Sequence, residues 1–258
     1  MIEKIEPKLE KKERGENIFQ RDIYYRHGEK TPEGELAPEG FKQAEEIGEA
    51  LETPEKGPKP YHSEVKRAGD FAKAIQEATK SQKEYKARTR FELGLSNLSK
   101  EFIAEWKKKT KEEGGITALE WYLSFGKEKP DVDTMSPYEM ASRVARNVLT
   151  HSKMTERYYN DSKIDLINGS HSPTLDVFIA TTLKEEIEKD PINPEGKNIT
   201  EKMGGRFKTA EQFEVDTTID NEGKKALEVK FRGKEYDLAK RKLEEMVSDL
   251  EKIEEKQE

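Results

Sequence analysis

The chain has 258 residues, of which 32% are hydrophobic and 39% are charged, and its formal net charge is −7 with no cysteine. The lack of cysteine excludes disulfides, thiolate zinc sites and thiol nucleophiles, and the close mixing of acidic and basic residues argues against a broad nucleic-acid surface. No apolar run approaches the roughly 18 residues of a membrane span, and the first residues lack the apolar segment of a signal peptide. We therefore expect a cytoplasmic protein that binds neither nucleic acid nor a membrane. The sequence leaves its oligomeric state open.

The first part of the chain predicts a charged arm, a strand and a helix. Residues 1–18 are rich in charge and offer little to bury, so we expect an arm there. Residues 21–26, "RDIYYR", predict a central strand that ends at His27. Residues 38–52 place apolar or small side chains, Phe41 among them, at helical spacing, and so predict a helix.

A second strand and helix follow, and then a third strand. Residues 60–63, "PYHS", predict a short strand, and Ser63 is a suitable N-cap for a helix over residues 64–80. Residues 84–95, "EYKARTRFELGL", predict another strand.

The region of about 98–160 differs in character from the rest of the chain. It contains three helical stretches and both tryptophans, Trp106 and Trp121. The third stretch opens with a capping box, in which Ser136 is the N-cap and Glu139 is the glutamate at position N3 that bonds back to it. We interpret this region as a helical cap inserted into a domain of residues 19–258.

The last hundred residues predict a strand, a helix, a hairpin and a final helix. The strand covers residues 163–169 and leads into "SHSP", after which Pro173 begins a helix. Two β-rich runs flank "NEG" at 221–223, which predicts a hairpin. Apolar residues from Tyr236 to Ile253 then recur at helical spacing. Packing on the sheet is the simpler interpretation of that helix, and a dimerising coil is the alternative.

This alternation predicts an α/β fold of three layers, in which helices cover both faces of a mostly parallel sheet. Ligands of such sheets gather at the carboxyl ends of the strands. His27, Ser63 and His171 each stand at the carboxyl end of a predicted strand, so one pocket can contain all three.

Several side chains near these strand ends suit a phosphate monoester. Arg26 and Arg67 can each bind two phosphate oxygens, and Gly28 allows the backbone to approach the phosphate. A neutral imidazole such as His27 can attack phosphorus. A second imidazole, His171, can donate to the oxygens where charge develops in the transition state.

The order of these motifs resembles that of a known family. The matching residues are Arg26, His27, Gly28 and Glu29, then Leu36, Gly40, Gln43 and Ala44, then Ser63, Arg67 and Ala68, and finally His171. They resemble the histidine phosphatase superfamily, the phosphoglycerate-mutase-like fold, over most of residues 20–190. The chain departs from the family pattern at Ala37, where threonine is usual, and at Ser172, where glycine is usual.

The resemblance implies a metal-independent phosphatase without a cofactor, acting on a phosphorylated small molecule or a phosphoprotein. His27 becomes phosphohistidine and water then releases phosphate, while Arg26, Arg67 and His171 bind the phosphoryl oxygens. An acidic residue protonates the leaving group. The family's Leu-x-Glu motif has no literal match here. Glu92 is nearest in position, and Glu101 fits if the loop is longer.

Two other functions remain open at this stage. The first is a mutase that moves phosphate between hydroxyl groups of a sugar acid. The second is a module that binds phosphate or a phosphoprotein with weak or lost catalysis, which the missing Leu-x-Glu favours. We expect His151 to have no chemical role, the two tryptophans to be core residues of the cap, and the lysines of 107–111 to lie at a solvated helix end. Those lysines could alternatively steer anionic substrates.

Overall fold

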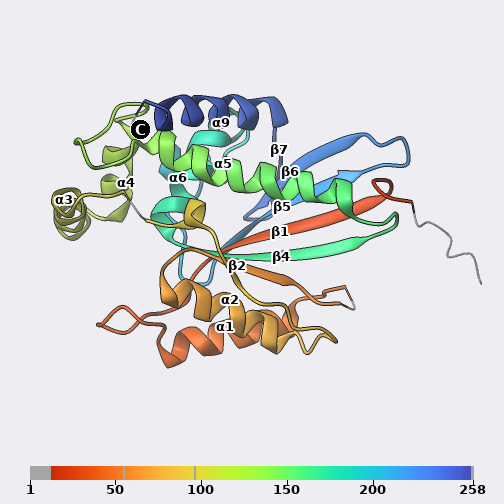
Figure 1. Ribbon diagram of the computed structural model, residues 1–258. Helices are drawn as coiled ribbons and strands as arrows, with labels where there is room; N and C mark the ends of the chain where they lie inside the picture. The colour runs from red at the N-terminus through yellow and green to blue at the C-terminus, as the bar shows by residue number, and fades with distance from the viewer. Residues whose placement is uncertain (1–12, 55, 96, 257–258) are drawn as a thin grey trace, which may run out of the picture.

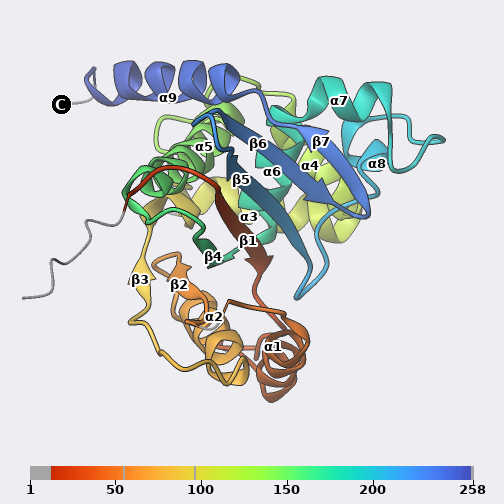
Figure 2. The same ribbon diagram turned by 90° about the vertical axis from the view of Figure 1, so that its right-hand side faces the viewer.

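The computed structural model describes residues 13–54, 56–95 and 97–256 of the chain. The arm predicted for residues 1–18 therefore lies mostly outside the described residues. Within them the strands form one seven-stranded sheet in the order β3-β2-β4-β1-β5-β6-β7 (Figure 2). Its strands are β1 (Ile18–Arg26), β2 (Lys59–His62), β3 (Arg88–Thr89), β4 (Lys163–Ser170), β5 (Gln212–Ile219), β6 (Lys225–Phe231) and β7 (Lys234–Asp237).

The sheet is mixed, with a parallel half and an antiparallel half. β3, β2, β4 and β1 run parallel to their neighbours. β5 pairs with β1 in antiparallel fashion, and β5, β6 and β7 continue as antiparallel neighbours. The predicted α/β fold with parallel core strands and a C-terminal hairpin is confirmed, although the hairpin has a further strand, β7, that the sequence did not indicate.

Helices cover both faces of the sheet, as Figure 1 shows. α1 and α2 lie on one face, and α5, α6 and α9 lie on the other, while α3 and α4 lie beyond the end at which β1 and β4 finish. The α-helices are α1 (Pro38–Ala50), α2 (Lys66–Ala78), α3 (Lys100–Glu112), α4 (Gly115–Leu123), α5 (Pro137–Met154), α6 (Ser172–Thr182), α7 (Lys184–Lys189), α8 (Ile199–Lys202) and α9 (Lys240–Glu254), and the 3-10 helices are η1 (Phe91–Leu93) and η2 (Thr155–Arg157).

β1 is central because both of its faces are apolar. Ile23 and Tyr25 belong to the core between the sheet and the α1–α2 layer, whereas Tyr24 belongs to the larger core on the side of α5, α6 and α9. This alternation follows from the two-residue period of a strand. The Tyr24 hydroxyl donates to the side-chain oxygen of Asn147 on α5, at 2.9 Å.

The predicted capping box at the start of α5 is confirmed, with Ser136 accepting from the Glu139 amide at 3.1 Å. α5 lies along the sheet and packs against both α6 and α9. α9 buries Leu243 and Met246 in the larger core, and Leu250 on the same helix is buried as well. The division of the chain into a domain and an inserted cap stays a prediction.

Three local predictions are wrong. Val65 is the N-cap of α2 and has an extended backbone, so Ser63 stands two residues before the cap. Only Arg88–Thr89 of the strand predicted over residues 84–95 pairs with the sheet, and a 3-10 turn follows it. Tyr236, predicted at the start of the last helix, lies in β7, and that helix begins at Lys240.

No helix within the described ranges is both long enough and apolar enough to cross a bilayer.

Candidate active site

The two candidate histidines are neighbours because the strands that carry them are neighbours. β1 and β4 run parallel with Arg26 opposite Ser170, so His27 and His171 both follow at the same edge of the sheet. The His27 amide donates to the Ser170 carbonyl at 3.1 Å. The centroids of the two imidazole rings are 5.2 Å apart. The structure thus brings together two residues that are far apart in the sequence.

His27 is held in one tautomer by its hydrogen bonds. Its Nδ1 lies 2.7 Å from the Gly28 carbonyl oxygen, which can only accept, so Nδ1 carries the proton. The lone pair is therefore on Nε2, where it accepts from Nε of Arg67 at 2.8 Å. In this tautomer the unprotonated Nε2 is the nucleophilic nitrogen, and it faces Arg67.

Burial and neighbouring cations keep both imidazoles neutral. Burial lowers the pKa of His27 from 6.5 to about 4, and Arg67 and Arg26 act in the same direction against the hydrogen bond to Gly28. The pKa of His171 is lowered well below its ordinary value, again by burial first and then by nearby positive groups. An unprotonated imidazole is the form that can attack phosphorus.

Arg26 and Arg67 reach the site from different elements. Arg26 ends β1, and its guanidinium donates to the Phe207 carbonyl oxygen. Arg67 lies in the first turn of α2, where the helix dipole adds positive potential. Its Nη1 donates to the Gly34 carbonyl at 3.1 Å, so the arginine also ties the loop after β1 to α2.

Ser63 contacts His171 instead of capping α2. Its hydroxyl lies 2.8 Å from Nε2 of His171 and accepts from the Val65 amide at 3.3 Å. Nδ1 of His171 is buried and has no hydrogen-bond partner in the part of the chain that the structure describes. A phosphoryl oxygen would provide a partner for this orphaned nitrogen.

Gly28 is required by helix packing. A Cβ at Gly28 would lie 2.7 Å from Cα of Gly40 and 2.8 Å from the side-chain oxygen of Gln43, both on α1. The Gln43 oxygen also accepts from the Glu29 amide at 3.0 Å, which fixes the loop after β1. The role of Gly28 in substrate binding stays a prediction.

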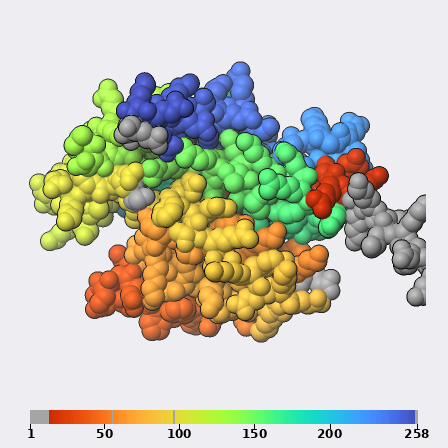
Figure 3. Space-filling view, in the orientation of Figure 1, coloured from red at the N-terminus to blue at the C-terminus, as the bar shows by residue number. Residues whose placement is uncertain are grey.

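A cavity of about 290 Å³ opens over the two histidines. One side is formed by strand ends and loops and the other by α3, and Figure 3 shows α3 (yellow) and the segment after β1 (red-orange) at the same end of the molecule. Its polar lining consists of cations, imidazoles, one serine and one tyrosine. It is lined by Arg26, His27, Lys30, Arg67, Leu95, Leu98, Phe102, Ile103, Trp106, Lys107, Tyr122, Met140, His171, Ser172, Pro173 and Arg206.

Neither candidate for the general acid is among the lining residues. Glu92 lies in η1 and is half-buried. Burial raises the pKa of the Tyr24 hydroxyl, and the nearby charge of Glu92 raises it further. Glu101 lies exposed in the first turn of α3. No aspartate or glutamate lines the cavity within the described ranges. The assignment of Glu92 stays a prediction.

Arg206 is a site residue that the sequence did not reveal. It lies between α8 and β5, and its Nε donates to the buried carboxylate of Asp176 at 3.2 Å. The same carboxylate accepts from the Phe207 amide at 2.7 Å, and Phe207 is the residue whose carbonyl holds Arg26. Asp176 therefore anchors the segment that places both arginines. An arginine before a β-rich run carries no signal of such a contact.

The remaining predicted residues have different outcomes. Trp106, expected in the core of the cap, also lines the cavity, as does Lys107 from the lysine run. His62, for which its place beside Ser63 suggests either a pocket or a surface position, is not among the lining residues, and its Nδ1 donates to the Ser63 carbonyl. His151 is fully buried far from the cavity lining, against Asp22.

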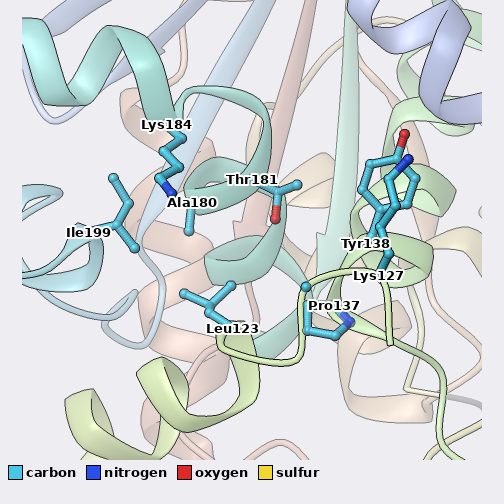
Figure 4. A pocket seen from close by; sticks show the side chains of 9 residues that line it. Leu123, Lys127, Pro137, Tyr138, Ala180, Thr181, Lys184 and Ile199 are labelled. Carbon is cyan, nitrogen blue, oxygen red and sulfur yellow. The ribbon is translucent and has the colours of Figure 1, made fainter. Parts of the chain in front are cut away.

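A second cavity, of about 220 Å³, lies between α4, α5 and the end of α6 (Figure 4). Leu123, Pro137 and Ile199 supply apolar walls, and Lys127 and Lys184 supply the charges. Among the described residues no histidine lines it, so it offers no imidazole nucleophile, and its Lys127 is already paired with Asp249 at 2.9 Å. Within the described ranges, no group of three or more potential ligands is placed to hold a metal ion.

Comparison with known proteins supports the same family. The model of the "Histidine phosphatase superfamily (branch 1)" matches residues 23–191. A search of curated proteins gives no match.

Solved structures share the fold at low identity, which carries no inference about activity. A phosphoglycerate mutase from Bacillus anthracis is 12% identical with a TM-score of 0.54, covering 92% of this chain and 99% of its own. Mycobacterial hydrolase 2 is 15% identical with a TM-score of 0.54, at 89% and 97% coverage. Mycobacterial glucosyl-3-phosphoglycerate phosphatase is 15% identical with a TM-score of 0.51, at 81% and 97% coverage.

Proposed function

The chain belongs to branch 1 of the histidine phosphatase superfamily, and on that premise we propose that it hydrolyses phosphate monoesters through a phosphohistidine at His27. The enzyme acts without a metal, because the guanidinium groups of Arg26 and Arg67 provide the positive charge that the phosphoryl group needs, and the neutral His171 ring adds a hydrogen-bond donor.

The reaction has two steps that balance. In the first, Nε2 of His27 attacks phosphorus, the bond from phosphorus to the ester oxygen breaks, and the alcohol leaves with a proton from an acid. In the second, water attacks the phosphohistidine and gives a proton to the conjugate base of that acid. The bond from phosphorus to Nε2 breaks, and the release of inorganic phosphate restores the neutral imidazole. His171 donates from its ring to an equatorial oxygen, while Arg67 turns from Nε2 of His27 to the phosphoryl oxygens.

The observation that carries this proposal is the state of the two imidazoles. Nε2 of His27 has its lone pair directed at an arginine, and the lowered pKa keeps that lone pair available at neutral pH. Beside it, Nδ1 of His171 is buried without a partner among the described residues. A tetrahedral oxyanion between the two rings and the arginines would give both Arg67 and Nδ1 of His171 a hydrogen-bond acceptor.

The test uses para-nitrophenyl phosphate, with and without a chelator. We expect chelator-resistant turnover that His27→Ala lowers by about ten-thousandfold, because no other group can form the phosphoenzyme. His62→Ala is the matched control. Like His27, His62 donates from Nδ1 to the carbonyl of the next residue, but it lies outside the cavity. Its rate should stay near that of the wild type. Equal turnover by His27→Ala and wild type would reject the proposal.

A second candidate function is phosphate binding with weak catalysis. It is favoured by the cavity lining, in which no described carboxylate can protonate a leaving group. Tight vanadate binding with no turnover on any ester would support this candidate. Phosphate exchange between sugar acids that depends on a bisphosphate primer would instead support a mutase.

A further inference from the structure

The cavity contains more positive charge than one phosphate requires. Arg26 and Arg67, beside the histidines, suffice for a phosphoryl dianion. Lys30 and Lys107 also line the cavity, and within the described residues neither lysine forms an ion pair with a carboxylate. This excess occurs in a chain whose net charge is −7.

The two lysines face one cavity from different elements. Lys30 lies on the loop that follows β1, and Lys107 lies on α3, where its side chain is exposed. The pKa of Lys30 is lowered by burial first and then by Arg67 and Lys107, so the two ammonium groups act on each other. An anion between two like charges relieves their repulsion.

Apolar side chains line the same cavity as the lysines and the histidines. Phe102, Ile103 and Trp106 project from α3 into the cavity lining. Ile103 is 37% exposed, although it is a large aliphatic residue. Arg206 lies over the Trp106 ring at 5.3 Å and is fixed by the buried Asp176. The wall is therefore rigid, apolar and flanked by cations.

We propose that the substrate is a small phosphate monoester with a second anionic group, such as a carboxylate, joined to the ester through an apolar or aromatic scaffold. This inference rests on the proposed function. The phosphate binds at His27, the scaffold lies against Trp106, and Lys30 and Lys107 bind the second anion. Lys30 and Lys107 thus determine specificity and have no part in phosphoryl transfer.

The test compares two isosteric esters, 4-carboxyphenyl phosphate and 4-carbamoylphenyl phosphate. We expect the wild type to favour the carboxylate by about tenfold in kcat/KM, and Lys107→Met to lower that preference about fivefold. The two esters have leaving groups of different reactivity. This difference affects the wild type and Lys107→Met equally, so it cancels when their preferences are compared. The preference of the wild type should also decline with added salt, because the lysines are near solvent.

Lys108→Met is the matched control, since it removes the same charge from the same helix outside the cavity. It should retain the full preference of the wild type. Turnover of both esters without a preference, or an equal loss in Lys107→Met and Lys108→Met, would overturn the inference and leave the phosphatase proposal intact.

Calorimetric binding of the same two esters separates the two failures. If neither these esters nor para-nitrophenyl phosphate turns over, the phosphatase proposal fails, and calorimetry still measures which ester binds more tightly. A preference for the carboxylate that Lys107→Met removes would then support the second anion site. Equal affinities would reject it.

Discussion

Two buried histidine environments lie along the same strand and differ in the charge that surrounds them. His151 on α5 is 0% exposed, and its Nδ1 lies 2.6 Å from the carboxylate of Asp22 on β1. Five residues after Asp22 and directly after β1, His27 is 5% exposed and faces Arg67. The buried His151 imidazole has a carboxylate as its hydrogen-bond partner. The buried His27 imidazole lies among cations instead, and an anion would complete that arrangement.

The contrast explains why only one end of the sheet is suited to catalysis. Asp22 also accepts from Nε2 of Gln20 at 2.7 Å, so the pair with His151 belongs to a polar cluster inside the core. Buried polar pairs of this kind are costly to break. Nε2 of His151 and Nδ1 of His171 are both buried without a partner among the described residues, but of the two it is His171 that lines the cavity. Perturbed groups in a cleft mark functional sites more often than core pairs do.

After the loss of His27 itself, the largest expected effect comes from the cation that distinguishes the two environments. Arg67→Ala should lower kcat/KM for para-nitrophenyl phosphate about a thousandfold, since it removes a donor to the phosphoryl oxygens. The pKa of His27 should also rise, because Arg67 contributes to lowering it. The acidic limb of the pH–rate profile should therefore move to higher pH.

Lys66→Ala is the control for Arg67→Ala. Lys66 precedes Arg67 in the same turn, is exposed, and pairs with Glu35 and Asp70 at the surface. Its removal should leave both the rate and the pH profile unchanged. A rate for Arg67→Ala within twofold of the wild type would remove Arg67 from the site.

The second expected effect concerns stability and pH. The pKa of His27 is about 4 in the folded protein against an ordinary 6.5. Between these values the unfolded chain binds a proton that the folded chain does not, so the free energy of unfolding falls as the pH drops from 6.5 to 4. The loss should be about 3 kcal/mol from this group.

His27→Gln removes the titrating group and should lose less stability over the same range. Urea unfolding at pH 7 and pH 4 measures the difference for each protein, and subtracting one difference from the other cancels most of the carboxylates common to both. Equal losses in the two proteins would mean that the fold does not hold His27 neutral.

Local patterns in the sequence predicted the elements and the strand ends. The β-rich run before His27 and the strand before His171 are readable because each lies in the parallel core of the sheet. The capping box at Ser136 is a contact within four residues, which the sequence encodes directly. These signals were enough to bring the two histidines to one edge.

The rest of the site depends on tertiary contacts that leave no local pattern. A serine after a strand suits an N-cap and a long-range hydrogen bond equally, and Ser63 makes the second. Lys107 and Arg206 reach the cavity from a helix and a loop whose placement depends on packing and on the buried Asp176. Residues 84–95 have strand character, but the edge of β2 offers pairing to two of them only.

The smallest expected effect comes from Ser63, which contacts His171 as Asp22 contacts His151 but carries no charge. Its hydroxyl orients the His171 ring with one hydrogen bond of 2.8 Å, and such a bond contributes about 1 kcal/mol. Ser63→Ala should therefore lower kcat about fivefold to tenfold. The Val65 amide also loses an acceptor at 3.3 Å, so some loss of stability is expected as well.

Ser63→Thr separates orientation from packing, because it keeps the hydroxyl while adding a methyl group in a fully buried position. If orientation of His171 is what matters, Ser63→Thr should retain more of the rate than Ser63→Ala, even where its melting temperature is lower. A rate that follows melting temperature across both variants would instead mean that Ser63 acts through packing alone. In that case the position of His171 directly after β4 would be enough to orient its ring. Ser63 would then not act on His171 as Asp22 acts on His151.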